Sequence, residues 1–284
     1  MGFILSFLAA GFVLQLASSR WPVRRFDAPK EVWIDLLALV LGLVIQLAIA
    51  AVAFPAISGV QHYEAVSASY RYLLTLPPLS AGLFYFLTTD LLAYWMHRLN
   101  HVRWLWDTHA FHHSARNLYW ASGMRGSPVH FLLLGLPALL VQVVFSPEGP
   151  VLALVMAYGV VHNSLIHSNL RIPTRLLNWI FVTGESHLVH HSRDLRYGNS
   201  NFGFLFTFWD RIFGTWVDPA SLTADEPLGL GYDIPYARLV VGLPPASPGR
   251  KALEESEALG GRRARPQEAG GRVVAQEHVE IRRA

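Results

Sequence analysis

Residues 97–113 read HRLNHVRWLWDTHAFHH and place five histidines within seventeen positions. His97 and His101 are four residues apart, and an H-x-x-H-H group follows after seven further residues. The preceding segment, 79–97, is largely apolar. Side chains three or four residues apart share one face of a helix. The stretch therefore predicts an apolar helix that brings imidazoles to its end, followed by a helical turn that carries more of them.

The same spacing returns at residues 187–191, which read HLVHH. Clustered imidazoles repel one another when protonated, and a bound cation that keeps them neutral removes this repulsion. We therefore predict that ten of the thirteen histidines are metal ligands, in four groups: His97 and His101; His109, His112 and His113; His162 and His167; and His187, His190 and His191. The isolated histidines are expected to be hydrogen-bonded or interfacial residues instead: His62, His130 and His278.

The histidine groups predict how many metal ions bind, but they leave several metals possible. Ten ligands exceed the capacity of one ion, so two ions are expected. His162 and His167 lie about 140° apart on a regular helix, so they share one site only if the helix ends or distorts there; otherwise they serve two metals. Imidazole suits zinc, copper, iron and nickel. The chain has no cysteine, which excludes thiolate ligands and disulfides.

The composition indicates an integral membrane protein. Hydrophobic residues make up 52% of the 284 residues and charged residues only 15%, whereas a soluble domain has about a quarter charged. The mean hydropathy is +0.30. The net charge of +3 comes from basic residues spread along the chain, so nucleic acid is not expected as a partner.

The apolar residues occur in runs that are long enough to cross a bilayer. We predict an all-α integral membrane protein with about four to five transmembrane helices and a cytoplasmic helical cap that holds a histidine-rich dimetal site. The predicted helices are residues 1–19, 32–57, 79–97, 128–145 and 151–167. We expect residues 1–78 to form the N-terminal transmembrane helices, 79–244 a membrane domain that carries the histidine groups, and 245–284 a tail without a fixed structure.

The distribution of basic residues predicts the orientation. The loop at 20–30 holds Arg20, Arg24, Arg25 and Lys30, whereas the loop at 58–78 holds only Arg71. Basic loops stay in the cytoplasm, so the helix at 79–97 ends on the cytoplasmic face. The helical hairpin at 128–167 crosses twice and returns the last histidine group to the same side.

Several residues are candidates to orient the imidazoles by hydrogen bonding. Ser186, directly before His187, is the predicted N-cap of a short helix that carries the last histidine group. The candidates that accept a ring N–H or bond to the backbone are Asp90, Glu185, Asp194, Asn199 and Asn201.

These histidine groups resemble those of the fatty acid hydroxylase superfamily, which includes sterol desaturases and alkylglycerol monooxygenases. The shared pattern is H-x(3,4)-H, H-x-x-H-H, a middle histidine pair, and H-x-x-H-H. Asn201-Phe202-Gly203 and the segment 209–215, WDRIFGT, are also similar. The resemblance covers about residues 80–218.

The resemblance implies a non-haem site with two iron ions, zinc being an alternative occupant, which uses dioxygen to hydroxylate or desaturate a lipid. A sterol, a fatty acyl chain, an alkylglycerol, an aminolipid head group and a carotenoid are all compatible substrates. The chain lacks a His-Pro-Gly-Gly haem motif and cysteines, so electrons are expected from a separate donor of the cytochrome b5, ferredoxin or reductase type. Two rival hypotheses are a zinc-dependent membrane hydrolase and a non-enzymatic membrane protein that binds metal or haem.

Overall fold

The computed structural model describes residues 2–24, 31–60, 68, 71–73, 75–145, 149–172, 176–223 and 225–244. Five long helices account for most of this part of the chain: α1 (Gly2–Arg20), α2 (Val32–Val60), α4 (Pro78–Asn100), α6 (Pro128–Phe145) and α7 (Gly149–His167). They coincide closely with the five apolar segments of the sequence. The expected tail, 245–284, lies outside the described residues.

The long helices lie alongside one another, and α6 packs against both α2 and α4. Helix α1 packs against α7. Pro78 and Pro128 are the first residues of α4 and α6, where proline fits because the first backbone N–H groups of a helix have no intrahelical acceptor. Within residues 2–244, the bundle therefore brings the ends of α4 and α7, with their histidines, toward one side.

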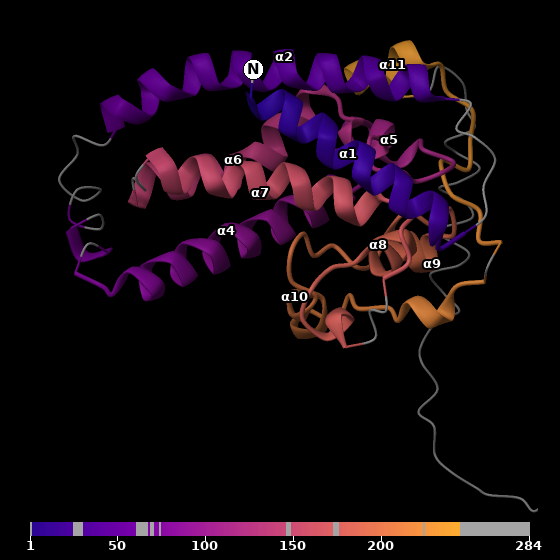
Figure 1. Ribbon diagram of the computed structural model, residues 1–284. Helices are drawn as coiled ribbons and strands as arrows, with labels where there is room; N and C mark the ends of the chain where they lie inside the picture. The colour runs from indigo at the N-terminus through magenta and orange to yellow at the C-terminus, as the bar shows by residue number, and fades with distance from the viewer. Residues whose placement is uncertain are drawn as a thin grey trace, which may run out of the picture. The chain divides into compact units, whose positions relative to one another are not determined.

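Short elements gather at that end of the bundle (Figure 1). The α-helices are α5 (Trp106–His113), α8 (Gly184–His190), α9 (Leu195–Gly198), α10 (Phe208–Ile212) and α11 (Tyr236–Val241), and the 3₁₀ turns are η1 (Ser122–Met124), η2 (Leu177–Trp179) and η3 (Pro219–Ser221). Isolated β-bridges join Pro22 to Leu170, Phe181 to Phe206 and Ser192 to Leu228. The described part of the chain is thus helical, with a cap of short helices and loops.

A buried ionic network fastens the cap to α2. Arg125 and Asp35 are almost completely buried and form an ion pair. Arg125 also contacts Glu31 at 3.0 Å and donates to Ser114 Oγ at 2.9 Å. The Tyr119 hydroxyl donates to Asp35 at 2.6 Å. Because removing one partner of a buried ion pair costs about 3–5 kcal/mol, this network holds the segment after α5 firmly against the start of α2.

The helices differ in how well they meet the criteria for a membrane span. Among the described residues, only the segment Val32–Ala53 of α2 is both long and apolar enough, and Pro128–Val141 of α6 is a shorter apolar stretch. Helix α4 carries Asp90, His97 and Arg98, which lower its hydropathy. The prediction of four to five transmembrane helices is therefore not confirmed, because one helix among the described residues meets both criteria.

Candidate metal centre

Four elements bring the predicted histidine ligands together. His97 lies in the last turn of α4, and His101 is its C-cap residue. Helices α5 and α8 carry the two H-x-x-H-H groups, and His167 is the last residue of α7. Nine of the ten predicted ligands form two buried groups, and in each group the ring nitrogens that could bind a metal lie within 4.8 Å of one another.

The first group, called here the five-histidine group, joins the end of α4 to both short helices. Its rings pack closely: the centroids of His97 and His190 are 4.4 Å apart, and those of His101 and His113 are 4.8 Å apart. The Nε2 atoms of His113 and His109 are separated by 3.2 Å. The members are His97, His101, His109, His113 and His190.

The second group, called here the four-histidine group, consists of His112, His167, His187 and His191. Its Nε2 atoms form a chain of short contacts: 3.2 Å from His112 to His167, 3.0 Å from His167 to His187, and 3.1 Å from His187 to His191. Four imidazoles bound tetrahedrally at 2.0–2.1 Å from one ion would have nitrogen separations of about 3.4 Å. The group is therefore close to the dimensions of a four-ligand metal site.

Each H-x-x-H-H motif is divided between the two groups. In α5, His109 and His113 belong to the five-histidine group, while His112 belongs to the other. In α8 the relation is reversed, because His190 alone joins the five-histidine group. Residues i and i+4 are only about 40° apart around a helix, whereas i+3 lies about 100° from i+4. One short helix thus contributes ligands to two adjoining centres.

Hydrogen bonds to backbone carbonyls determine which nitrogen of several rings carries the proton. The Nδ1 atoms of His97 and His190 lie 2.9 and 2.8 Å from the carbonyl oxygens of Phe202 and Ser200. The Nδ1 atom of His167 is 2.7 Å from the carbonyl oxygen of Asn163. A carbonyl oxygen can only accept, so each Nδ1 carries the hydrogen and each Nε2 presents a lone pair.

The lone pairs point at one another. His112 Nδ1 is 3.3 Å from the carbonyl oxygen of Arg125, so the Nε2 atoms of His112 and His167 are two acceptors in contact. In the five-histidine group, Nε2 of His190 and Nε2 of His101 are buried and make no hydrogen bond within the described residues. Acceptors that face each other without a donor are unfavourable, and a cation between them removes the repulsion. The donor sets therefore fit two metal ions.

The pKa values of the clustered histidines favour neutral imidazole rings, which is the form that binds a metal. Burial is the largest effect that lowers the pKa values of the α5 and α8 histidines, and repulsion between neighbouring rings lowers them further. These pKa values lie well below the ordinary value of 6.5 for His109, His112, His113, His187, His190 and His191. Metal binding requires neutral imidazole, so the fold itself favours the protonation state that ligands need.

His162 is placed outside both groups. Its Nε2 is 2.8 Å from the carbonyl oxygen of Phe204, and its Nδ1 is 3.3 Å from the Tyr158 hydroxyl. It lies five residues before His167 on a continuous helix, so the two rings point in different directions. From the sequence we expected that His162 and His167 either share one metal site or bind two different metal ions. The position of His162 outside both groups matches neither expectation.

His130, expected to be a hydrogen-bonded or interfacial residue and not a ligand, belongs to neither group and is hydrogen-bonded beside the site. It is 2% exposed, and its Nδ1 is 2.7 Å from His109 Nδ1. Two glycines make room for such rings: a Cβ at Gly123 would lie 2.5 Å from His167 Nδ1, and one at Gly126 would lie 2.5 Å from Cδ2 of His130. In the sequence, the feature that could have indicated this position is the segment from Gly123 to His130, in which two glycines precede the histidine. His62 and His278 lie outside the described residues.

The candidate orienting residues have different positions. Asn199 Oδ1 is 3.2 Å from His101 Nδ1. Asp90 accepts hydrogen bonds from the backbone N–H groups of Leu205 and Phe206, and so holds a loop rather than a ring. The other three candidates also act on the backbone or lie in the cap: Asn201 Nδ2 donates to the carbonyls of Ser186 and Val217, Asp194 pairs with Arg196, and Glu185 lies in the first turn of α8.

The start of α8 differs from the prediction that Ser186 is its N-cap. The N-cap is Thr183, whose hydroxyl accepts from the backbone N–H of Ser186, and the Ser186 hydroxyl in turn accepts from the backbone N–H of Thr183. The helix begins at Gly184, three residues before His187, so Ser186 falls at the third helical position of a capping box. This reciprocal pair fixes the helix that carries His187 and His190 and has His191 as its C-cap.

An apolar cavity of about 370 Å³ opens onto both groups. Its walls come largely from α2, α4, α6 and α7, and six histidines border it: His97, His109, His112, His130, His167 and His187. Two polar wall residues are bonded within the protein: Thr89 donates to the carbonyl of Tyr85, and Asn163 donates to that of Gly123. The cavity therefore presents mainly hydrocarbon to whatever enters it.

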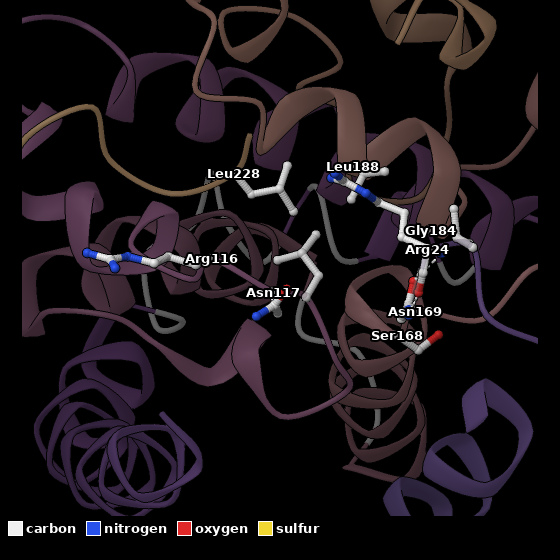
Figure 2. A pocket seen from close by; sticks show the side chains of 10 residues that line it. Arg24, Arg116, Asn117, Ser168, Asn169, Gly184, Leu188 and Leu228 are labelled. Atoms are coloured by element: carbon white, nitrogen blue, oxygen red, sulfur yellow. Dashed lines mark hydrogen bonds between the residues drawn. The ribbon is translucent and has the colours of Figure 1, made fainter. Parts of the chain in front are cut away.

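A second hollow is lined in part by residues of α8. Figure 2 shows Arg24, Asn169 and Ser168 on one side of it, below Leu188 of α8, and Arg116 at the opposite edge. Its volume is about 60 Å³, and no histidine lines it. Of these two hollows, the apolar cavity is thus the one that gives a ligand access to the histidine groups.

The described part of the chain is a helical bundle whose cap holds two adjoining groups of histidines beside an apolar cavity. Residues 82–215 match the family described as fatty acid hydroxylase. The matched region contains all nine clustered histidines and ends at Thr215, which donates to Asp210 at 2.7 Å.

Three relatives illustrate the range of the similarity. The chain is 31% identical to the ornithine lipid hydroxylase OlsE of Rhizobium tropici over 64% of its own length and 53% of the relative's. It is 30% identical to the alkylglycerol monooxygenase of Xenopus tropicalis over 46% of its length and 29% of the relative's. It is 30% identical to methylsterol monooxygenase 2-2 of Arabidopsis thaliana over 47% of its length and 51% of the relative's.

The chain spans about half the length of the ornithine lipid hydroxylase and the methylsterol monooxygenase, and less of the alkylglycerol monooxygenase. No solved structure matches it. All three relatives carry names of lipid-oxidising enzymes, and the family match lies on the histidine-bearing region.

Proposed function

We propose that this protein is a membrane-bound non-haem di-iron oxygenase that hydroxylates or desaturates a lipid. The observation that carries the proposal is the pairing of two histidine groups, whose Nε2 lone pairs converge, with one apolar cavity that reaches both. The names of the relatives, a lipid hydroxylase and two monooxygenases, support the same reaction class.

The nine clustered histidines would hold the two iron ions: five in one group and four in the other. Bound iron supplies the activation of dioxygen and the oxidising power to attack an unactivated C–H bond. The protein contributes the rest. Backbone carbonyls fix the ring tautomers, the buried cap excludes water, and the cavity walls position the carbon chain beside the histidines.

The substrate that suits the cavity is a lipid with a long hydrocarbon part. The wall groups Thr89 and Asn163 are bonded internally, so the cavity offers little to a polar head group. A sterol, a fatty acyl chain and an alkylglycerol each bring such a hydrocarbon portion. The chemical outcome, an alcohol or an alkene, depends on which C–H bonds the bound lipid presents to the site.

The proposed location is a membrane, with the metal centre on the cytoplasmic face. Large apolar side chains are exposed on the outer surface of the long helices, among them Phe12 of α1, Val44 and Leu47 of α2, Leu79 of α4 and Leu132 of α6. Large apolar side chains exposed on several long helices suit a surface in contact with lipid. The basic residues between α1 and α2 favour a cytoplasmic cap. Electrons would come from a separate cytoplasmic donor.

The test is to purify the protein from its membrane and measure bound metal, oxygen uptake with a reductase system, and the masses of lipids after turnover. We expect about two iron ions per chain, oxygen uptake that depends on lipid, and products that gain one oxygen atom or lose two hydrogens. Bound zinc together with lipid hydrolysis and no oxygen uptake would instead establish the rival hydrolase.

A further inference from the structure

His130 lies in the first turn of α6 and contacts one member of the five-histidine group. Its Nδ1 is 2.7 Å from His109 Nδ1, and the two rings stack with centroids 4.7 Å apart and an interplanar angle of 25°. Both residues are at most 2% exposed. The ring of His130 is not one of the nine clustered rings, so it contacts the site without belonging to either group.

The proton between His109 and His130 has a defined position if His109 is a ligand. A neutral imidazole has one N–H and one lone pair. His109 Nε2 faces His113 Nε2 at 3.2 Å in the five-histidine group, so a ligand at this position needs its lone pair on Nε2 and its hydrogen on Nδ1. His109 Nδ1–H then donates to His130 Nδ1, and His130 carries its own hydrogen on Nε2.

This arrangement differs from that of the neighbouring rings. His97, His112, His167 and His190 donate to backbone carbonyls, which accept in every state of the protein and cannot be removed by mutation. His109 depends on a side chain that accepts in only one of its two neutral tautomers. A substitution at residue 130 can therefore remove the acceptor and leave the ligand in place.

The surroundings hold His130 in the required position. Its backbone N–H donates to Ser127 Oγ at 3.2 Å, and the Ser127 hydroxyl donates to the carbonyl of Thr108 at 2.7 Å, one residue before His109. The ring also stacks on His112 with centroids 5.3 Å apart. Gly126 leaves space for it, because a Cβ there would lie 2.5 Å from Cδ2 of His130.

We propose that His130 is a positioning residue that accepts the Nδ1–H of His109 and thereby aims the His109 Nε2 lone pair into the five-histidine group. This inference rests on one part of the proposed function, which is that the two histidine groups bind metal ions. It assigns a role in metal binding to a histidine outside the spaced motifs.

The decisive comparison is between His130→Leu, which fills similar space without an acceptor, and His130→Gln, whose Oε1 can still accept. We expect His130→Leu to bind one of the two metal equivalents about 10- to 100-fold more weakly, with the second equivalent unchanged. His130→Gln should restore most of the affinity. Competition with a chelator measures both constants, and Mössbauer spectra of iron-57 protein show which centre has changed.

The matched control is Val129→Ala, in the same turn of α6, 40% exposed and outside the cavity wall; it should bind both metals like the parent protein. His130→Met provides a second variant without a strong acceptor if His130→Leu does not fold. Unchanged affinity and unchanged spectra in a folded His130→Leu or His130→Met protein would overturn the positioning role. Two zinc ions in the parent protein would contradict the oxygenase while leaving the test of His130 intact.

Discussion

At the scale of single residues, adjacent histidines have different tasks. His112 and His113 are neighbours in the chain, but the first lies in the four-histidine group and the second in the five-histidine group. His190 and His191 are divided in the opposite order, the first in the five-histidine group and the second in the four-histidine group. A pair of adjacent histidines at the end of a short helix is thus a device for serving two centres at once, because successive side chains point about 100° apart.

The first prediction follows from this division. His113→Ala should weaken the metal of the five-histidine group, and His112→Ala that of the four-histidine group, so each single variant is expected to retain about one metal equivalent and lose lipid oxidation. The double variant should lose both. Metal analysis with spectra of the remaining ion distinguishes the two single variants, and identical spectra would contradict the division.

His162→Ala is the matched control for these variants. It removes a buried histidine of the same motif set that bonds to the carbonyl of Phe204 and lies outside both groups. The loss of this hydrogen bond should cost about 1 kcal/mol of stability while both metal equivalents remain. Loss of one equivalent in His162→Ala would show that this ring binds metal after all.

At the scale of elements, the segment between α9 and α10 aligns the site. The carbonyls of Ser200, Phe202 and Phe204, at alternate residues, bond to the rings of His190, His97 and His162. Two buried carboxylates hold this segment. Asp90 of α4 accepts from Leu205 and Phe206, and Asp210 of α10 accepts from the backbone N–H groups of Phe202 and Gly203.

The second prediction concerns the pH dependence of stability. Burial raises the pKa of Asp210 to about 6, although hydrogen bonds from Thr215, Gly203 and Phe202 oppose the shift. The unfolded carboxyl titrates near 3.9, so between about pH 4 and 6 the folded protein keeps a proton that the unfolded chain has released. The contribution of Asp210 to stability is therefore greatest below pH 4 and is lost as the pH rises to about 6.

Asp210→Asn removes this titration. The stability advantage of the parent protein over the variant should shrink by up to about 3 kcal/mol between pH 4 and 6.5. Unfolding in detergent, followed at several pH values for both proteins, measures this difference directly, since effects of other groups cancel. A difference that does not change with pH would contradict the raised pKa.

At the scale of the whole bundle, four helices that are distant in sequence enclose one apolar cavity. Gly135 of α6 lines it, and a Cβ at this position would meet no atom within 4 Å. A larger side chain there projects into free space and shortens the cavity without straining the helix. Gly82 of α4 is equally open but does not line the cavity.

The third prediction compares substitutions at Gly135 and Gly82. Gly135→Leu should lower kcat/KM for a long-chain lipid by about 10- to 100-fold, since the leucine occupies space that the lipid needs, while both metal equivalents are retained. Gly82→Leu should match the parent protein in both measurements. Equal activity of the two variants would show that the lipid binds elsewhere.

The sequence by itself determined the local features of this protein. Helix positions follow from apolar runs and prolines near their ends, and the ligand chemistry follows from histidine spacing in a chain without cysteine. These properties depend on neighbouring residues, so they are readable without a fold. The same motifs carried the resemblance to the fatty acid hydroxylase family.

Only the tertiary structure decided how the rings are shared. The division of each H-x-x-H-H motif, the position of His162 outside both groups and that of His130 beside His109 depend on which side chains meet across α4, α5, α6 and α8. The cavity likewise needs walls from four helices. Spacing along one helix gives the direction of a side chain, whereas its partner comes from a segment tens of residues away, and only packing brings the two together.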